Sequence, residues 1–538
     1  MMYQLNWLTK TRYSFVRYPQ VNLLIWLIPL LLLNFGENSL MAHNESLYAA
    51  RAKLMFDSGN LISPWYTHHQ IPGFYWIIAI FYRLFGVNEI AARIPAMIAS
   101  ILMIFVIYEI ATILLGKTLA YLSVGILSVE FLWLQYSRLV APDIPTLLLV
   151  FTAILCLLKS ESQPRLRQGY GFLIGLCFGL GFFLVGFMIF LPMVALLPYV
   201  IRENYRHNLL FNPMLYVGFV VGLIPTFIWL WLSWSSYGIS NFGELLQLVF
   251  QLGSREPDGN NILFYVWNIP LMSFPWFFFA VFGLVSVIRY PTSKYLFLLV
   301  GFPVVLLMEI SLFTTRFSHY SLGIYPFIAM LAAIGLDWLG KFYELKKLTY
   351  LQSPITRNIS YIFGLVGFIF LLIGAIILVV GVLLDVENID KYIIFAIVTG
   401  LSCFIVPLVW ICRYYFNQRY LTAEVWIYAW LVSAWLSIAA AGSLGLLSDF
   451  NPRFRTFFQQ ESITNITKDQ SIHFVRWTHK YAELVYFNTP IPGKNVNEIS
   501  ELSPLDYAWI DTSNSGNLQQ KYKVVDEIKD YQLIQILP

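Results

Sequence analysis

Apolar residues occur along this chain in runs of about the length that crosses a lipid bilayer. A membrane-spanning helix needs about 20 mostly apolar residues. Runs near that length lie at 20–36, 90–113, 118–135, 142–158, 214–234, 262–288, 295–313, 320–340, 358–384, 392–412 and 421–446. Because lipid offers the backbone no hydrogen-bond partner, these runs are expected to be helices. The pattern predicts a polytopic α-helical membrane protein.

One further run, at 169–201, is long for one crossing and short for two. The loop before it, at 159–168, and the loop after it, at 202–208, are both basic. Short basic loops stay on the cytoplasmic side, so the run should cross an even number of times. Two short helices broken around 181–186 satisfy that rule and bring the predicted total to about 13 transmembrane helices.

The same charge rule orients the chain in the cell membrane, that is, the inner or plasma membrane. Basic residues favour the cytoplasm for the N-terminus and for alternate loops. The segments expected on the external side are 37–89, 136–141, 235–261, 314–319, 385–391 and everything after about residue 447. The prediction is therefore a multi-pass protein with a cytoplasmic N-terminus and an extracytoplasmic C-terminal region.

The pattern changes after Asp449, where charged and amide residues return and the apolar runs shorten. Short runs rich in β-formers are typical of strands. Such runs lie at 483–487, 507–511, 522–525 and 531–537, and the Pro-Gly-Lys-Asn sequence at 492–495 is expected to be a turn. Residues 1–447 are thus predicted to form the transmembrane bundle, and residues 448–538 a small external α/β domain.

Composition agrees with a membrane protein and narrows its partners. Only 12% of the 538 residues are charged, about half the share of an ordinary soluble domain. The net charge of +4 gives no indication of nucleic-acid binding. The four cysteines all fall in apolar runs without metal or disulfide spacing, so they are interpreted as small buried side chains.

The stretch 41–76 is the most polar and titratable segment next to the predicted bundle. Three of the seven histidines, His43, His68 and His69, lie in it beside Glu45 and several aromatic residues. A helix is expected over 45–58, because Asn is a good N-cap and Gly59 suits the residue after a helix. Capping alone explains an Asn at position 44, and packing is an alternative explanation for the paired histidines.

Three other external features carry charge. Asp143 lies where a helix re-enters the membrane, a position where a carboxylate either caps the helix or has a function. Arg316, His319 and Tyr320 precede a later helix and suit either a phosphate or an interfacial anchor. The loop 235–261 is either a lid over a site or a solvated loop.

Several motifs follow one another in a specific order. They are His43-Asn44-Glu45, Asp57-Ser58-Gly59-Asn60, His68-His69-Gln70-Ile71-Pro72-Gly73, Asp143-Ile144-Pro145 and the segment 320–326. In this order they resemble the GT-C fold glycosyltransferases that depend on polyprenyl phosphate, in the superfamily of protein O-mannosyltransferases and lipid A aminoarabinose transferases. The resemblance covers about residues 20–340, and the C-terminal region matches only in layout.

The resemblance implies transfer of a sugar from a polyprenyl-phosphate carrier to a lipid, glycan or protein acceptor on the external face, with inversion at the anomeric carbon. It also implies contact with membrane lipids, no organic cofactor, no nucleic acid and a monomeric state. A divalent metal of unknown identity is one expectation. The roles implied are Glu45 and Asp143 in catalysis, Arg138, Arg316, His319 and Tyr320 at the carrier phosphate, His43, Asn44, His68, His69 and Gln70 at a metal or substrate, and Arg255, Glu256 and Asp258 in an acceptor loop.

Three positions depart from the superfamily. Asn44 stands where an aspartate is usual, and Gln70 and Val185 stand where lysines are usual. An amide neither acts as a base nor neutralises charge. Either Glu45 and Asp143 perform the acid–base work, with Arg138, Arg316 and His319 supplying charge, or the chain is an inactive copy that binds a lipid carrier or a partner enzyme. A transporter is a third alternative, although few charges lie in span centres, where transport sites occur.

Overall fold

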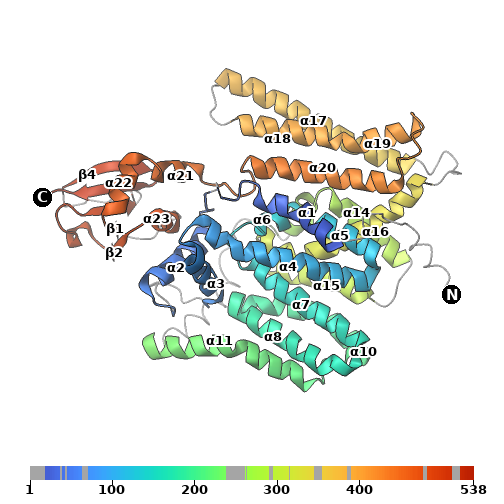
Figure 1. The fold of residues 1–538 in the computed structure, drawn as a ribbon, viewed down its shortest axis with the longest axis horizontal. Coiled ribbons are helices and arrows are strands. Elements are labelled where there is room, and N and C mark those ends of the chain that lie inside the picture. Colours follow the sequence, from blue (N-terminus) through green and yellow to red (C-terminus); the bar gives the residue numbers. More distant parts are fainter. Residues whose placement is uncertain are drawn as a thin grey trace.

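The computed structural model describes residues 19–36, 39–42, 45–62, 71–237, 261, 263–289, 295–313, 315–344, 354–384, 389–475, 481–511 and 521–538. Within these ranges the chain forms a bundle of helices followed by a small domain with a five-stranded sheet. The bundle helices lie side by side, and the sheet domain stands at one end of the bundle next to α2 (Glu45–Ser58) (Figure 1). The predicted fold class is confirmed.

Two groups of helices make up the bundle in chain order. The first group is α1 (Pro19–Leu32), α2, α3 (Gly73–Phe85), α4 (Glu89–Leu115), α5 (Lys117–Leu127), α6 (Phe131–Tyr136), α7 (Asp143–Ser162), α8 (Arg167–Val185), α9 (Phe190–Arg202), α10 (Asn204–His207) and α11 (Pro213–Tyr237). The second is α13 (Phe264–Met272), α14 (Trp276–Arg289), α15 (Phe302–Leu312), α16 (Tyr325–Glu344), α17 (Pro354–Leu384), α18 (Asp390–Cys403), α19 (Ile405–Tyr414) and α20 (Ala423–Ser443). Short 3-10 or π turns lie at Pro164–Leu166, Gly186–Ile189, Phe297–Gly301 and Ser318–Ile324.

The multi-pass architecture follows from the length and composition of these helices. Among the described residues, eight helices are long and apolar enough to cross a membrane, and a ninth crossing results if the bent pair α13 and α14 counts as one. Shorter apolar helices include α5 and most of α1. The total of about 13 needs those shorter helices as well, so it stays a prediction.

The run from 169 to 201 folds as a hairpin, as its basic flanks predicted. Helix α8 ends at Val185, and Gly186 adopts a φ of +61° that favours glycine. The Arg167 guanidinium donates a hydrogen bond to the carbonyl of Arg206. The two ends of the segment therefore meet at the same end of the bundle.

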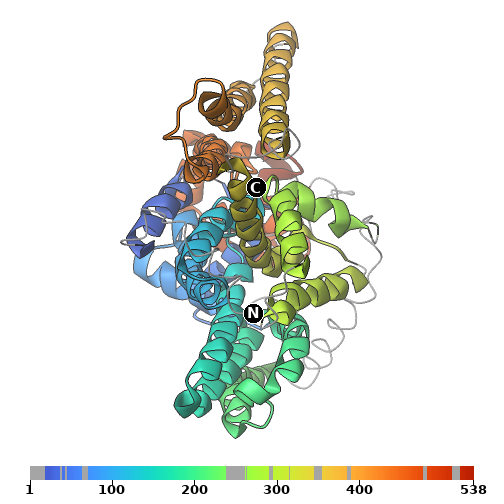
Figure 2. The ribbon, with the colours of Figure 1, turned by 90° about the vertical axis from the view of Figure 1, so that its right-hand side faces the viewer.

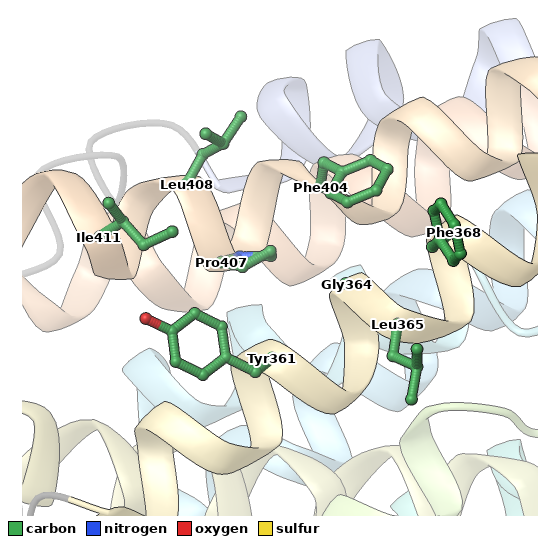
Figure 3. A pocket seen from close by; sticks show the side chains of 8 residues that line it. All are labelled: Tyr361, Gly364, Leu365, Phe368, Phe404, Pro407, Leu408 and Ile411. Atoms are coloured by element: carbon green, nitrogen blue, oxygen red, sulfur yellow. The ribbon is translucent and has the colours of Figure 1, made fainter.

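The outer edge of the bundle is formed by α17, α18 and α19, at the top of Figures 1 and 2. A groove of about 380 Å³ lies between α17 and α19. Its lining, shown in Figure 3, is Tyr361, Gly364, Leu365, Phe368, Phe404, Pro407, Leu408 and Ile411. Apart from the phenol of Tyr361, these side chains are apolar, and the lining includes no carboxylate, imidazole, amine or guanidinium group.

The C-terminal domain contains α21 (Pro452–Phe458), α22 (Glu461–Asp469), α23 (Ala482–Asn488), a 3-10 turn (Ile499–Glu501), and strands β1 (Ile472–Val475), β2 (Pro492–Val496), β3 (Tyr507–Asp511), β4 (Tyr522–Ile528) and β5 (Tyr531–Ile536). The strand order is β2-β1-β3-β5-β4. Strand β1 runs parallel to β2 and β3, and β5 runs antiparallel to β3 and β4. The boundary at 447/448 stays a prediction.

Two sequence predictions in this domain are wrong. The run at 483–487, expected to be a strand, is helix α23, and the expected turn at 492–495 is strand β2. Leu484 and Val485 are almost fully buried, and a short run buried on all sides lacks the periodicity that separates helix from strand. Pro492 fits β2 because it begins a strand at the sheet edge, where a missing N–H is tolerated.

The domain shares one hydrophobic core with α2 and α3. Tyr75 and Tyr82 of α3 and Met55 of α2 belong to the same buried cluster as Phe474 and Trp509 of the C-terminal domain. Apolar area removed from water contributes roughly 25 cal/mol per Å². This shared core therefore fixes the domain against these two helices.

Lys53 of α2 adds a polar contact across the same interface. Its ammonium donates to the carbonyls of Phe487 at 3.2 Å, Tyr486 at 3.4 Å and Thr489. These carbonyls lie at the C-terminal end of α23, where helix acceptors lack partners and the helix dipole favours a cation. Lys53 thus holds the end of α23 against α2.

Replacing Lys53 with Met should lower the thermal unfolding midpoint in detergent. Buried carbonyls left without a donor cost about 1–3 kcal/mol. The matched control is Lys523→Met, because Lys523 is exposed on β4. Equal midpoints for the two variants would contradict the contact.

The difference between wild type and Lys53→Met should widen as the pH rises from about 8 to about 10. Burial lowers the pKa of Lys53 to about 8, whereas an unfolded lysine has a pKa of about 10.4. The unfolded chain then binds more protons in this window, so the Lys53 contribution to stability increases with pH. Scanning fluorimetry across this range measures it.

Candidate active site

A buried ion pair lies at the start of α2. Glu45, at 1% exposure, is paired with Arg93 of α4 at 0% exposure. The Arg93 Nε and Nη2 atoms each donate to a different oxygen of Glu45 at 2.9 Å. A bidentate arginine–carboxylate contact of this kind fixes both the distance between the two side chains and their relative orientation.

Two backbone groups complete the surroundings of Glu45. The N–H of Met41 donates to Oε2 at 2.8 Å, and the N–H of Val140 donates to Oε1 at 2.9 Å. A carboxylate has about four lone-pair positions, and these four donors occupy them. Glu45 therefore positions the segment before α2 and the loop before α7. Its expected role as a catalytic base stays a prediction that this geometry does not favour.

The hydrogen bonds continue from this pair into the C-terminal domain. Arg93 Nη2 also donates to the carbonyl of Ser39 at 3.1 Å. The Ser39 hydroxyl donates to Asp449 at 2.7 Å and accepts from the N–H of Asn451 at 2.9 Å. Lys529, near the chain end, donates to the Asn451 side chain at 3.4 Å. The loop geometry thus depends on residues close to both ends of the sequence.

Asp143 begins α7 and faces groups from three other parts of the chain. His319 interacts electrostatically with Asp143, and Asp143 in turn interacts with Tyr48 of α2. Tyr320 interacts with both Asp143 and Tyr48. The structure therefore brings together Asp143, His319 and Tyr320, which the sequence placed in separate loops.

Aromatic rings enclose His319. Its imidazole stacks on Tyr136 at 5.4 Å and on Phe317 at 5.5 Å between ring centroids, and it meets Tyr320 edge-on at 4.7 Å. The segment that carries His319 is also held by α13, because the Tyr265 hydroxyl donates to the carbonyl of Phe317 at 3.0 Å. This packing fixes the imidazole of His319, which interacts electrostatically with Asp143.

Tyr48 of α2 packs against two aromatic side chains of α3. Its ring lies 5.5 Å from the ring of Tyr75 and 5.5 Å from that of Phe74. Burial, and then the neighbouring Tyr75 and Asp143, raise the pKa of the Tyr48 hydroxyl well above its ordinary value. The hydroxyl therefore stays protonated and remains available as a hydrogen-bond donor to an oxygen in the site.

The two arginines expected at the carrier phosphate have backbone partners. Arg138 is fully buried and donates to the carbonyls of Leu30 at 2.7 Å and Leu33, at the end of α1. Arg316 donates to the carbonyl of Ser311 at 3.2 Å. Arg138 therefore stabilises the end of α1, and its phosphate role stays a prediction that the geometry does not favour. Arg316 is half-buried, and its role also stays a prediction.

Arg51 is a cation at this site that the sequence reasoning did not select. It lies one turn after Tyr48 in α2, and it interacts with the Tyr75 hydroxyl by charge and a hydrogen bond. Residues three apart on a helix share a face, so the spacing of Tyr48 and Arg51 was a usable signal. Arg51 received no predicted role, because it lies outside the motifs that carry the resemblance.

Val185, which stands at one of the positions where a lysine is usual, ends α8 near the start of α3. A Cβ on Gly73 would lie 2.2 Å from the carbonyl oxygen of Phe183, and a Cβ on Gly186 would lie 3.4 Å from Ile71. Residue 185 at the end of α8 is therefore close to residue 71, the neighbour of residue 70. Tyr75, the partner of Arg51, lies one helical turn beyond Ile71.

Several predicted residues lie outside the described residues. They are His43, Asn44, His68, His69, Gln70, Arg255, Glu256 and Asp258. In the part of the chain that the structure describes, no group of three or more His, Cys, Asp or Glu side chains is placed to hold a metal ion. The metal and acceptor-loop assignments stay predictions.

The family described as dolichyl-phosphate-mannose-protein mannosyltransferase matches residues 68–232. An uncharacterized protein of Aquifex aeolicus is 35% identical over 130 residues, 23% of this chain and 26% of that protein. An undecaprenyl phosphate-alpha-4-amino-4-deoxy-L-arabinose arabinosyl transferase of Erwinia tasmaniensis is 31% identical over 218 residues, 39% of this chain and 38% of that protein. The matches thus span between a quarter and two-fifths of these relatives.

Almost the whole chain shares its fold with a solved structure. The crystal structure of ArnT from Cupriavidus metallidurans bound to undecaprenyl phosphate aligns with a TM-score of 0.73, covering 96% of this chain and 97% of that one at 15% identity. The apo form of the same protein aligns with a TM-score of 0.69. The expected GT-C fold is confirmed, including the small C-terminal domain beyond the family match.

Replacing Glu45 with Ala should destabilise the protein strongly. The change leaves the Arg93 charge buried without its partner, which typically costs about 3–5 kcal/mol. Changing both residues to Met removes both charges and should restore most of the unfolding midpoint, as measured by scanning fluorimetry. A Glu45→Ala variant with an unchanged midpoint would contradict the positioning role and favour a catalytic one.

Proposed function

We propose that this chain is an integral-membrane glycosyltransferase that moves a sugar from a polyprenyl-phosphate carrier to a lipid, glycan or protein acceptor. The main support is the site beside α7, where Asp143, His319, Tyr320, Tyr48 and Arg51 meet within a fold shared with an enzyme bound to undecaprenyl phosphate. The proposal includes an external site, a cytoplasmic N-terminus and a monomer.

The chemistry assigned to the site is a direct displacement. An acceptor hydroxyl or amine attacks the anomeric carbon, the bond from that carbon to the phosphate oxygen breaks, and the acceptor proton passes to Asp143. Attack opposite the leaving group inverts the anomeric carbon. The departing polyprenyl phosphate carries the negative charge, which preorganised cations and hydrogen-bond donors stabilise.

The residues divide these tasks by chemical type. Asp143 supplies the carboxylate of the site. His319 interacts electrostatically with it and either orients this carboxylate or binds the phosphate. Arg51 supplies the guanidinium that matches phosphate oxygens. Its partner Tyr75 lies one helical turn beyond Ile71, which is close to Gly186. The hydroxyls of Tyr48 and Tyr320 supply further hydrogen bonds. A divalent metal ion at the carrier phosphate remains part of the proposal.

The alternative is an inactive copy that binds the carrier or a partner enzyme. Asn44, Gln70 and Val185 favour it, because each replaces a charged group of the superfamily. A combined Asn44→Asp and Gln70→Lys variant separates the two proposals. A large gain in transfer indicates a weakened enzyme, and no gain indicates a binding protein.

The test of the main proposal is transfer by the purified protein in nanodiscs. Labelled polyprenyl-phosphate sugars are incubated with the protein and a membrane extract, with an active relative as the positive control. Transfer of label to a lipid, glycan or protein is expected. No transfer from any carrier, while the control is active, would contradict the proposal.

Asp143→Asn should lower kcat by about 10²–10⁴-fold, the usual contribution of a general base. The side chain keeps its size, so the unfolding midpoint should stay close to that of the wild type. Asp57→Asn is the control, because Asp57 is an exposed carboxylate in the same external region. Wild-type kcat in the Asp143 variant would remove Asp143 from the mechanism.

Arg51→Gln should weaken binding of polyprenyl phosphate by about 10–100-fold, because a hydrogen bond to a charged group contributes about 1.5–3 kcal/mol. The measurement is equilibrium binding of the carrier lipid, which applies whether or not the protein turns over. Arg51→Lys should retain part of the affinity. Arg83→Gln removes an exposed arginine at the end of α3 and should change nothing; equal losses would argue against a phosphate contact.

A further inference from the structure

A polar cavity lies at the end of the bundle opposite the proposed active site. It has a volume of about 400 Å³ and is lined by residues of α4, α7, α8, α10 and the segment before α15. Two arginines, Arg167 and Arg206, share its lining with Tyr205, Tyr295 and Glu161. Nothing in the proposed transfer reaction uses these side chains.

Helix α7 separates this cavity from the proposed active site. Asp143 begins α7, while Glu161 and Ser162 end it and line the cavity. Twenty residues of α-helix span about 30 Å, the thickness of the hydrocarbon core of a bilayer. The position of α10 at the end of the bundle opposite α2 agrees with this distance (Figure 1). The cavity therefore opens at the membrane surface opposite the proposed active site.

The two arginines of the cavity differ in their partners. Arg206 is ion-paired with Glu203 at 3.0 Å and lies 3.9 Å from Glu161. Arg167 donates to the carbonyls of Ser160 at 3.4 Å and Arg206. Among the described residues, no carboxylate forms an ion pair with Arg167. The Arg167 guanidinium is thus held in place by neutral carbonyl groups.

The surroundings of the cavity suit an amphipathic ligand. Leu158 and Ile113 line one wall, so the cavity offers apolar contacts next to the arginines. Leu166 and Ile201 beside it are 55% and 63% exposed, which places the rim at the depth of lipid. A ligand that fits must combine an anionic group with an apolar chain.

We propose that this cavity binds the phosphate headgroup of an anionic glycerophospholipid from the leaflet opposite the proposed active site. Arg167 and Arg206 receive the phosphate, because guanidinium donors match phosphate oxygens. The hydroxyls of Tyr205 and Tyr295 meet the glycerol end, and the first carbons of an acyl chain lie on Leu158. Basic cavities between transmembrane helices on the cytoplasmic side bind such headgroups in general.

The test is native mass spectrometry of the full chain released from nanodiscs that contain phosphatidylglycerol or phosphatidylcholine. The wild type should retain phosphatidylglycerol and not phosphatidylcholine. Arg167→Gln should lower this retention about fivefold, the usual effect of one cation at an anionic lipid surface. Arg165→Gln removes an exposed arginine outside the cavity and should have little effect.

Glu161→Gln should change retention in the opposite direction. The amide oxygen still accepts the hydrogen bond from the Tyr199 hydroxyl, while the negative charge that repels a phosphate is removed. Phosphatidylglycerol retention should therefore increase, a result that misfolding does not produce.

Three results would overturn the proposal. Equal losses in the Arg165 and Arg167 variants would indicate a diffuse surface charge. Equal retention of the two lipids would indicate no recognition of the headgroup. Displacement of phosphatidylglycerol by millimolar inorganic phosphate would indicate a site for a soluble anion instead of a lipid.

Discussion

The ion pair between Glu45 and Arg93 is the constraint on which the proposed site and its surroundings depend. Both charges are almost completely removed from water, so each needs the other, and Arg93 also needs the carbonyl of Ser39 as an acceptor. Glu45 also receives the N–H groups of Met41 and Val140. One carboxylate thus fixes the segment before α2, the helix α4 and the loop that leads to Asp143. The site beside α7 keeps its shape because this pair cannot shift without exposing a charge to an apolar interior.

The sequence predicted those parts of the fold that local patterns determine. The helix over 45–58 was expected with the bounds that the structure has, because its cap and terminating glycine are local signals. The hairpin of α8 and α9 followed from the charge of its flanking loops. The predicted strand at 483–487 is a helix because its burial on all sides comes from the tertiary structure. A local pattern carries no information about such contacts.

The candidate site was predicted only in part, because local patterns do not show which residues meet in the fold. Asp143, His319 and Tyr320 were selected by residue type, and the fold brings them together. The partner of Glu45 was missed because Arg93 lies 48 residues away within an apolar run. Arg138 was expected at a phosphate because only its charge was visible, whereas the carbonyls that it meets belong to α1, more than 100 positions earlier. Residue chemistry identifies candidates, and only long-range packing shows which charges are already paired.

The contact between Ser39 and Asp449 joins residues that are 410 positions apart. A ribosome adding about 5–20 residues per second needs at least about 20 s to cover that interval. During this time the segment before α2 lies in or beside the membrane without the carboxylate that later holds it. The segment before α2 therefore reaches its final geometry only after α20 has been made. A chain interrupted before Asp449 has the side chains of the proposed site but lacks the contact that fixes this segment.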